Sequence, residues 1–350
     1  MRKKITIYDI AREAGVAPST VSRVFSGHES VSAKTRAKVE AIARKHQFTT
    51  VQNMRQQLTL AQQTIAVIMP ETNAQYFVRI LSAATHEAKR MGFQTMLFQL
   101  PEDTSYDMVE IAQRIIHWRL YGAFYIGGIT EGEREDLPAA LNLLLRHMPL
   151  VALSPPHKDV HCTFLHNDLE ASMFNAVQHL YMLGHRRIAF IGGNRTPEAS
   201  GARGKGYLRA VETLKLEKNP AYQSASGFTA ETGEIAVLRM LTTLPKAKWP
   251  TAMIAFNDMI AIGALHQLHV MNLKVPEDMA LIGCDNAAFS SCTIPPLTTI
   301  DLFSEERAST AIAELITHTD THNAPITHVR APALIIRESC GVKLGPRNLA

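Results

Sequence analysis

The sequence predicts two folded parts: an all-α helix-turn-helix headpiece, then a larger α/β domain built from two parallel-sheet subdomains. Three observations predict this division. The first 60 residues carry eleven Lys and Arg against four Asp and Glu, whereas the rest of the chain is faintly acidic. Short apolar segments at helical spacing fill the same region, and strand-like segments alternate with amphipathic ones after it. At 350 residues the chain has room for two or three domains.

The first predicted helix begins after Thr6 and ends at Gly15. Thr6 is a favourable N-cap, Asp9 stands in the first turn, and Gly15 readily adopts the left-handed conformation that ends a helix. The apolar residues of this segment fall on one face: Ile7, Ile10, Ala11 and Ala14.

Two more helices follow the first within the headpiece. Pro18 suits a first helical position, and Ser32 is a favourable N-cap for the third helix. The inward side chains of these two helices are Val21, Val24, Phe25, Val39, Ile42 and Ala43. The basic side chains predicted to face outward from the third helix are Lys34, Arg36, Lys38, Arg44 and Lys45.

The spacing from Ala11 to Gly15-Val16 is typical of a helix-turn-helix, because the small Ala lets the helices approach and Gly permits the turn. A three-helix bundle without a DNA role has the same local pattern, and the basic charge favours DNA binding. Residues 5 to 46 also resemble the headpiece of the lactose-repressor (LacI/GalR) family of transcription regulators. The matching motifs are Thr6-x-Tyr8-Asp9-Ile10-Ala11, Thr20-Val21-Ser22-Arg23-Val24 and Val31-Ser32-Ala33-Lys34-Thr35-Arg36.

The resemblance implies DNA contacts for the headpiece. It places the second helix in the major groove, with Pro18, Ser19 and Arg23 at the base edges, and Arg suits guanine O6 and N7. It also implies phosphate contacts, which set the register on the duplex and make the affinity salt-dependent. These implied phosphate contacts are Tyr8, Thr20, Ser22, Ser32, Lys34 and Thr35.

Residues 47 to 63 read either as a flexible spacer or as a helix of modest propensity, because they contain six Gln and no Gly or Pro. The family's hinge helix lies here and drives a Leu into the minor groove. Aligning Arg55 with the family's Arg places Gln57 at the wedge position and Leu58 one residue later. Either Leu58 reaches the groove through a shifted register or the wedge is weaker in this chain; the first alternative is slightly favoured.

From residue 64 the pattern predicts parallel sheets with crossover helices. The ligand of such a domain lies at the carboxyl ends of the strands, in the cleft between the two half-domains. The predicted strands are Thr64–Met69, Thr95–Phe98, Ala123–Ile126, Leu150–Leu153, Arg187–Ile191, Ala252–Phe256 and Ala280–Gly283.

Polar side chains follow several of these strands, and they suit a polyhydroxyl ligand because Asn, Asp and Arg each bond adjacent hydroxyls. Such residues also cap the helices that follow strands, so each alone is open to both interpretations. Residues 64 to 340 resemble the family's periplasmic-binding-protein-like effector domain, with two Rossmann-like subdomains. The resemblance implies effector contacts at Asp168, Arg203, Asn257 and Asp285, with Tyr76 and Phe77 as an apolar wall.

The predicted domain organisation has four parts. The divisions are a headpiece at 1–47, a linker at 48–63, an N-terminal effector subdomain at 64–183 plus 301–329, and a C-terminal subdomain at 184–300 plus 330–342.

The resulting hypothesis is a cytoplasmic repressor that binds operator DNA as a homodimer and responds to a small effector, most simply an inducing sugar. No export signal or membrane span is expected, and the four Cys residues form no pair at metal or redox spacing. We expect no cofactor, no catalytic residues and no metal, since His157, His161 and His166 fit no zinc motif. The alternatives are a corepressor-dependent regulator that responds to a nucleobase, nucleoside or sugar phosphate, and a sugar enzyme with an accessory DNA-binding head.

Overall fold

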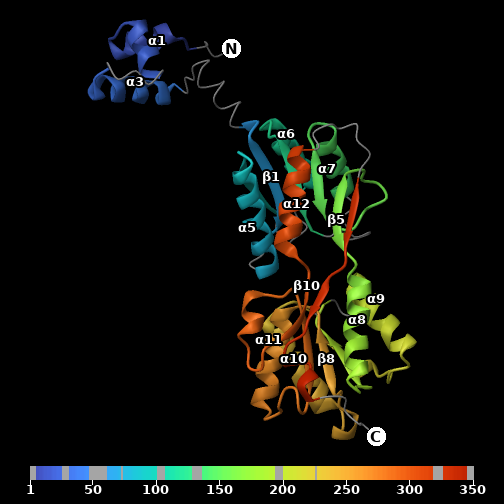
Figure 1. Cartoon of the computed structure of the whole chain (residues 1–350). Coiled ribbons are helices and arrows are strands. Elements are labelled where there is room, and N and C mark those ends of the chain that lie inside the picture. The colour runs from blue at the N-terminus through green and yellow to red at the C-terminus, as the bar shows by residue number, and fades with distance from the viewer. Residues whose placement is uncertain are drawn as a thin grey trace.

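A helical headpiece and two α/β subdomains make up the chain (Figure 1). The structure is a computed structural model that describes residues 5–25, 31–46, 61–71, 74–100, 107–127, 136–193, 200–224, 227–317 and 326–344. Within these ranges no helix combines the length and apolar character that a membrane span requires.

The headpiece contains α1 (Ile7–Ala14), α2 (Pro18–Phe25) and α3 (Ala33–Lys45). At the start of α1 the backbone N–H and hydroxyl of Thr6 donate to Asp9 Oδ2 at 2.9 and 2.6 Å. Gly15 follows α1 with φ of 67°, and Ser32 Oγ accepts a bond of 3.2 Å from the Thr35 amide at the start of α3. The three helix boundaries predicted from caps and Gly are therefore confirmed.

A small apolar core joins the three helices. Ile10, Val21 and Val39 come one from each helix and are fully buried. Arg36 was predicted to face outward, but its guanidinium is part-buried and donates to the Val24 carbonyl at 3.1 Å. The side chain therefore ties α3 to the end of α2, because the last carbonyls of a helix lack partners within it.

The N-terminal subdomain is a parallel sheet with two helices on each face. The strand order is β11-β5-β4-β3-β1-β2. Its strands are β1 (Thr64–Pro70), β2 (Gln94–Leu100), β3 (Gly122–Ile126), β4 (Leu150–Leu153), β5 (Thr163–Asn167) and β11 (Thr327–Arg330). Its helices are α5 (Gln75–Arg90), α6 (Met108–His117), α7 (Asp136–Leu145) and α12 (Ser304–Thr317).

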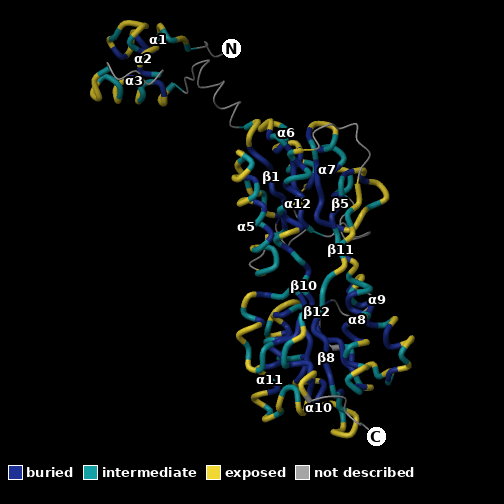
Figure 2. The backbone as a smooth tube through the Cα atoms, viewed as in Figure 1, coloured by how far each residue is buried: buried dark blue, intermediate teal, exposed yellow. Residues whose placement is uncertain are grey.

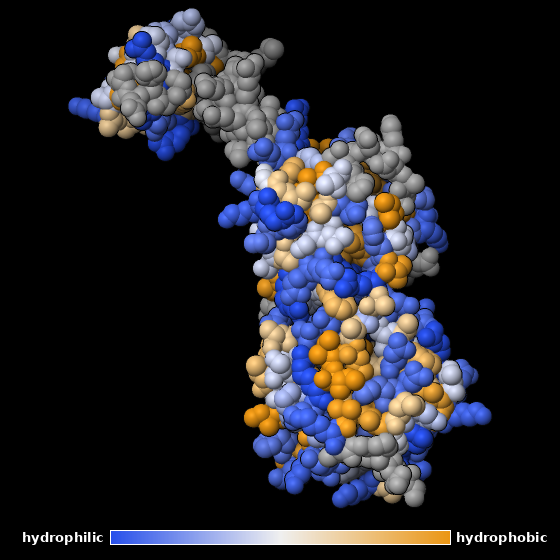
Figure 3. All heavy atoms as spheres, viewed as in Figure 1, coloured by the Kyte–Doolittle hydropathy of each residue, from blue (hydrophilic) through white to orange (hydrophobic). Residues whose placement is uncertain are grey.

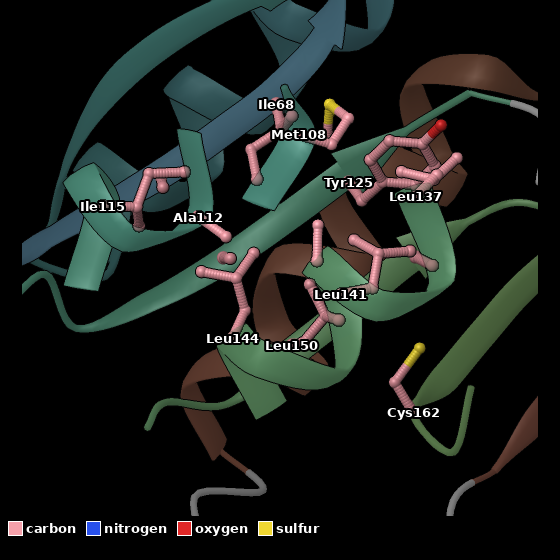
Figure 4. Close-up of a cluster of buried hydrophobic side chains, with 14 of the residues drawn as sticks. Ile68, Met108, Ala112, Ile115, Tyr125, Leu137, Leu141, Leu144, Leu150 and Cys162 are labelled. Carbon is pink, nitrogen blue, oxygen red and sulfur yellow. The ribbon is translucent and has the colours of Figure 1, made fainter. Parts of the chain in front are cut away.

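Strand β1 shows why this sheet carries helices on both faces. Ile65 and Val67 pack with α5 and α12, whereas Ala66 and Ile68 pack with α6 and α7. Figure 4 shows the second of these clusters, with Met108 and other apolar side chains of α6 and α7 against the sheet. Because alternate residues of a strand point to opposite faces, a continuous apolar run is what a two-sided sheet requires.

The C-terminal subdomain repeats the arrangement with strand order β12-β10-β9-β8-β6-β7. All its strand pairs are parallel except β10 with β12. Its strands are β6 (Ile188–Ile191), β7 (Gln223–Ser224), β8 (Ala252–Ala255), β9 (Ala280–Cys284), β10 (Thr298–Asp301) and β12 (Ala333–Ile335). Its helices are α8 (Leu169–Met182), α9 (Gly201–Thr213), α10 (Ala230–Thr243) and α11 (Asp258–Val270), and short 3-10 turns lie at Pro220–Tyr222, Lys246–Lys248, Ala288–Ser291 and Val342–Leu344.

The chain crosses between the subdomains three times: from β5 to α8, from β10 to α12, and from β11 to β12. The crossings are bonded to one another, since Asn167 Nδ2 donates to the Leu302 carbonyl at 3.0 Å and the Asp168 amide donates to the Arg330 carbonyl at 3.1 Å. The prediction had placed the first crossing at 183–184. Helix α8 instead packs on α9 and the second sheet, so the crossing falls at Asn167–Asp168.

Seven strands were predicted from their apolar pattern, and each overlaps a strand of the structure. The pattern missed β5, β7, β10, β11 and β12. Strand β11 (sequence Thr-His-Val-Arg) has one apolar residue and β7 spans two residues, so both lack the apolar run on which the prediction relied. Strand β12 is apolar but only three residues long. Figure 2 shows the contrast between the dark core strands of each sheet and the more exposed β11.

Candidate functional site

The headpiece presents one exposed face of α2. Ser19, Ser22, Arg23 and Pro18 are exposed there, while Thr20 is half-buried. Their neighbours Val21 and Val24 point into the headpiece core, so the 3.6-residue period directs the other side chains outward. Three residues of this face, Pro18, Ser19 and Arg23, were predicted to contact base edges, and Thr20 and Ser22 were predicted to contact phosphates.

The other side chains predicted to contact phosphates lie at the starts of α1 and α3. Tyr8 is 65% exposed, and Lys34 is exposed. Ser32 and Thr35 bond each other through their hydroxyls at 2.9 Å, while Ser32 also caps α3. A hydroxyl retains a further acceptor or donor position after such a bond, so the cap leaves a phosphate contact open to both side chains.

The acidic residue Glu13 forms ion pairs inside the headpiece. Glu13 accepts from Lys45 Nζ at 2.8 Å and contacts His46 Nε2 at 2.5 Å. Hydrogen bonds from Lys45 and then His46 hold the pKa of Glu13 below its ordinary value. The ion pair offsets the charge of Glu13 with that of Lys45, so the positive charge offered to an anionic partner comes from the other Lys and Arg residues of the headpiece. The predicted hinge contacts Arg55, Gln57 and Leu58 lie outside the described residues.

In the α/β domain, Arg203 and Asp285 meet at the carboxyl ends of the second sheet. Arg203 Nη2 lies 3.3 Å from Asp285 Oδ1, and each side chain is 15% exposed. The guanidinium also lies over the Phe256 ring, 4.3 Å from its centroid, which is a cation–π contact. Among the described residues Arg203 Nε is buried with no hydrogen-bond partner, so the pair retains a donor for a ligand.

The environment of Asp285 opposes its ionisation. Burial raises the pKa of the Asp285 carboxyl to about 6, against the opposing effect of the Arg203 and Arg79 guanidinium groups. Its backbone φ is 108°, in the left-handed half of the map where a side chain other than Gly is strained. Strain of this kind persists only where surrounding contacts enforce it, and it is concentrated at binding sites.

Aromatic side chains border this pair on two sides. Phe228 is 50% exposed and contacts Phe256 edge to face at 5.2 Å. From the N-terminal subdomain, Tyr76 packs against both the first and the second sheet's cores, and its ring meets Phe77 at 5.1 Å. The aromatic groups therefore come from both subdomains, and the apolar wall of Tyr76 and Phe77 stays a prediction.

Asn257 and Asp168 serve as N-caps. Asn257 Oδ1 accepts from the Ile260 amide at 2.8 Å, and its Nδ2 donates to the Phe228 carbonyl at 3.0 Å. Asp168 Oδ1 accepts from the Ala171 amide at 2.9 Å, at the first crossing between the subdomains. Both residues therefore cap helices, and their contact with an effector stays a prediction; Asp285 caps no helix and meets Arg203 directly.

Sequence reasoning missed three residues of this region: Phe228, Asp258 and Arg79. Phe228 had a weak signal, since a large aromatic residue stands between Gly227 and Thr229 in a turn segment. Asp258 directly follows a predicted strand and its neighbour Asn257, but it was not among the predicted effector contacts; its carboxylate is buried and accepts from Thr299 Oγ1 at 2.6 Å. Arg79 gave no signal, because its partners lie more than 200 residues away in the chain.

One cavity of about 650 Å³ lies elsewhere, at the amino ends of the first sheet's strands, beside Gln62, Arg119, Tyr121 and His147. We give more weight to the strand carboxyl ends, because ligands of open α/β sheets bind there. Among the described residues no group of His, Cys, Asp and Glu is arranged to hold a metal ion.

The fold and the two sites define a class of protein: a DNA-binding regulator with a helix-turn-helix headpiece and a two-subdomain effector-binding domain. The chain belongs to the LacI family of bacterial regulatory proteins, whose family description matches residues 6–50. Residues 177–340 match the periplasmic binding protein-like domain. As a member of this family the protein is a transcription regulator and not an enzyme.

Named relatives agree with this assignment. The chain is 30% identical over 300 residues to the HTH-type transcriptional repressor CytR of Escherichia coli K12, covering 84% of each protein. It is 26% identical over 335 residues to the ribose operon repressor of Haemophilus influenzae, covering 95% of this chain and 98% of that one. The structure of the Lac repressor dimer bound to operator and the anti-inducer ONPF has a TM-score of 0.69 at 24% identity, covering 97% and 99% of the two chains.

Proposed function

We propose that this regulator is a repressor that releases its operator when a neutral sugar binds between the two α/β subdomains. The observation that carries the proposal is the Arg203–Asp285 pair, which lies at the strand carboxyl ends with the Arg203 guanidinium over the Phe256 ring. An Arg and an Asp side by side offer donors and acceptors to adjacent hydroxyls. Aromatic faces beside them suit the apolar face of a pyranose or furanose ring.

The charge balance of the site favours a neutral effector over a sugar phosphate. Arg203 is balanced by Asp285, and the second guanidinium nearby, Arg79, is balanced by Glu305 at 2.5 Å. A phosphate would need a cation without such a partner, because desolvating an anion beside neutral ion pairs is costly. A third guanidinium near this loop, Arg337, donates to Asn286 Oδ1, Ser290 Oγ and the Leu297 carbonyl at 2.8, 3.0 and 2.6 Å, so its donors are already engaged within the protein.

A nucleobase or nucleoside that acts as corepressor is the second candidate. The exposed edge-to-face pair of Phe228 and Phe256 favours it, since an aromatic surface stacks on a planar base. The two candidates predict opposite responses: a sugar inducer weakens operator binding, and a nucleoside corepressor strengthens it.

The proposal extends to the DNA complex. Two headpieces of a homodimer bind a near-palindromic operator, with Pro18, Ser19 and Arg23 at base edges, and the hinge contributes Arg55 with either Gln57 or Leu58. The protein acts in the cytoplasm, where the operator is. The predicted headpiece at 1–47 and linker at 48–63 are part of this proposal. Sedimentation of the full chain tests the dimer.

The experiment begins by selecting bound fragments from genomic DNA with the full chain. Binding to a selected fragment is then measured with monosaccharides, disaccharides and nucleosides. Arg23→Ala is expected to lose roughly 10- to 100-fold in affinity, while Arg12→Ala, an exposed neighbour on α1, serves as the control for basic charge. Normal binding by Arg23→Ala would show that the headpiece assignment is wrong.

The effector half is tested with Asp285→Asn. We expect operator binding without effector to be kept and the response to effector to be lost or weakened at least tenfold, because the anionic acceptor is removed. Asp159→Asn, whose side chain is 62% exposed, is the control. A normal response by Asp285→Asn would place the effector elsewhere.

A further inference from the structure

Arg79 donates to four acceptor atoms on three residues, which belong to both subdomains. From α5 its Nε and Nη2 donate to the two carboxylate oxygens of Glu305 on α12, at 2.5 and 2.7 Å. Its Nη1 donates to the carbonyls of Asp285 and Asn286, at 3.0 and 2.8 Å. These carbonyls belong to the loop after β9, so a single planar guanidinium bridges the N-terminal subdomain and the effector loop of the C-terminal one.

The backbone of the loop that Arg79 bonds, at Asp285 and Asn286, is strained. Asp285 and Asn286 have φ of 108° and 47°, both in the left-handed half of the map. The C-terminal subdomain holds the loop's amides, since Asp285 donates to Ile300 and Ala287 donates to Asp258 Oδ2 at 2.7 Å. The two carbonyls on the other side of the peptide units bond the N-terminal subdomain through Arg79, so the conformation that presents Asp285 depends on both subdomains.

We propose that Arg79 and Glu305 form an inter-subdomain clamp: the ion pair positions the Asp285–Asn286 loop and fixes the crossing segment 301–303 that leads into α12. Glu305 lies in the first turn of α12, directly after this crossing. Asn286 Nδ2 donates to Asp301 Oδ2 at 3.0 Å, and Asp301 Oδ1 accepts from the Phe303 amide at 2.8 Å. The clamp, the loop and the crossing are therefore one bonded network.

The surroundings favour a clamp over an incidental surface ion pair. The Arg79 side chain is 21% exposed, and its fork engages the carboxylate through two parallel bonds, which is the strong form of this interaction. Helices α5 and α12 pack against each other along the first sheet, so they form a firm base for the pair. Figure 3 shows hydrophilic residues gathered where the two subdomains meet.

The clamp goes beyond the proposed function, because Arg79 is a positioning residue and not a proposed effector contact. Its test uses the full chain without any effector. A failure of the clamp would leave the effector proposal standing, and a different effector would leave the clamp standing.

Hydrogen–deuterium exchange of the ligand-free chain tests the clamp, because the amides of Asp285, Asn286 and Ala287 are all hydrogen-bonded. Arg79→Ala is expected to raise exchange of peptides covering the loop and the crossing 301–303 by about tenfold or more, since two carbonyl bonds and the ion pair are lost together. Glu305→Gln is expected to raise it less, because Arg79 keeps its carbonyl bonds.

The matched control is Arg90→Ala. Arg90 lies on the same helix and makes the same two-bond fork with Glu87, at 2.8 and 2.5 Å, but that pair is confined to α5. We expect its loop and crossing exchange to equal the wild type. Three outcomes overturn the clamp: unchanged exchange in Arg79→Ala, a rise confined to the loop that spares the crossing, or an equal rise in every peptide of the domain.

Discussion

The buried carboxyl of Asp258 makes the stability of the C-terminal subdomain depend on pH. Asp258 is 1% exposed and accepts from Thr299 Oγ1 and from the Ala287 amide, at 2.6 and 2.7 Å. Burial raises its pKa to about 7, with the Thr299 hydrogen bond opposing the shift and the nearby Asp285 charge adding to it. The ordinary value is 3.8, so the folded protein holds this proton over a pH range in which the unfolded chain has lost it.

The direction of this pH dependence follows from the difference in proton binding between the folded and unfolded states. Between about pH 4 and pH 7 the native state binds more protons at Asp258 than the unfolded state, so the free energy of unfolding falls as pH rises. The favourable contribution is complete below the unfolded pKa and is lost as pH rises through the folded one. Between pH 5 and pH 8 the two pKa values correspond to a loss on the order of 3 kcal/mol from this one group.

Asp258→Asn removes this titration and keeps the shape of the side chain. The fluorescence of Trp249 reports on the C-terminal subdomain once Trp118, the other of two Trp residues, is replaced by Phe in every protein compared. From pH 5 to pH 8 we expect the midpoint of thermal unfolding to fall by roughly 5–10 °C more in the Asp258 protein than in the Asn variant.

Asp159→Asn is the matched control, since its side chain is 62% exposed, and it is expected to keep the steeper profile. Parallel pH profiles for the Asp258 protein and Asp258→Asn would refute the reasoning. They would mean that the carboxylate is ionised in the folded protein at pH 5 and that its two hydrogen bonds outweigh its burial.

Three further predictions concern packing and reactivity. A Cβ at Gly263 would lie 1.8 Å from the Ala230 carbonyl oxygen, so Gly263→Ala should separate α10 from α11. We expect denaturant unfolding to show a destabilisation of the domain by about 1–3 kcal/mol or more. An unchanged unfolding midpoint would contradict the close approach of the two helices. Ile10→Ala empties the centre of a small core at about 2–5 kcal/mol, so DNA binding should be lost while the α/β domain keeps its melting temperature. Cys292 is exposed, and the other three thiols are buried. Thiol labelling of the native chain should therefore show one fast-reacting site, and Cys292→Ser should abolish it. A fast labelling phase that survives this change would show that a buried thiol is accessible.

The headpiece could be predicted from sequence because its signals are local. The Thr6 cap, the Gly15 turn and the Ser32 cap each act within one helical turn, and the structure places all three helix ends there. Strand β11 has no such signal, and β12 has only a three-residue apolar run. Each is half-exposed and forms through pairing with a distant strand, β5 or β10, so the sequence pattern of the segment itself contains little of the cause.

The roles of single side chains in the effector region were equally hard to predict from local sequence. Asn257 and Asp285 both follow predicted strands, and sequence reasoning left open whether such residues cap helices or meet a ligand. Backbone geometry decides which of the two side chains caps a helix. Asn257 precedes α11 and caps it, whereas Asp285 has φ of 108° and its carboxylate lies beside Arg203. Neither Phe228 nor Arg79 directly follows a predicted strand, so a rule based on the ends of predicted strands could not find them.

The position of Asp285 bears on how the proposed effector would act. Its carboxylate meets Arg203 of the C-terminal subdomain, while its carbonyl accepts from Arg79 of the N-terminal one. An effector that bonds the Asp285 carboxylate competes with Arg203 for that carboxylate. It also acts on a strained residue whose carbonyl is bonded by Arg79. Binding free energy at this residue is then coupled to the arrangement of the subdomains, and linkage requires the arrangement favoured by the operator to change effector affinity by the same factor.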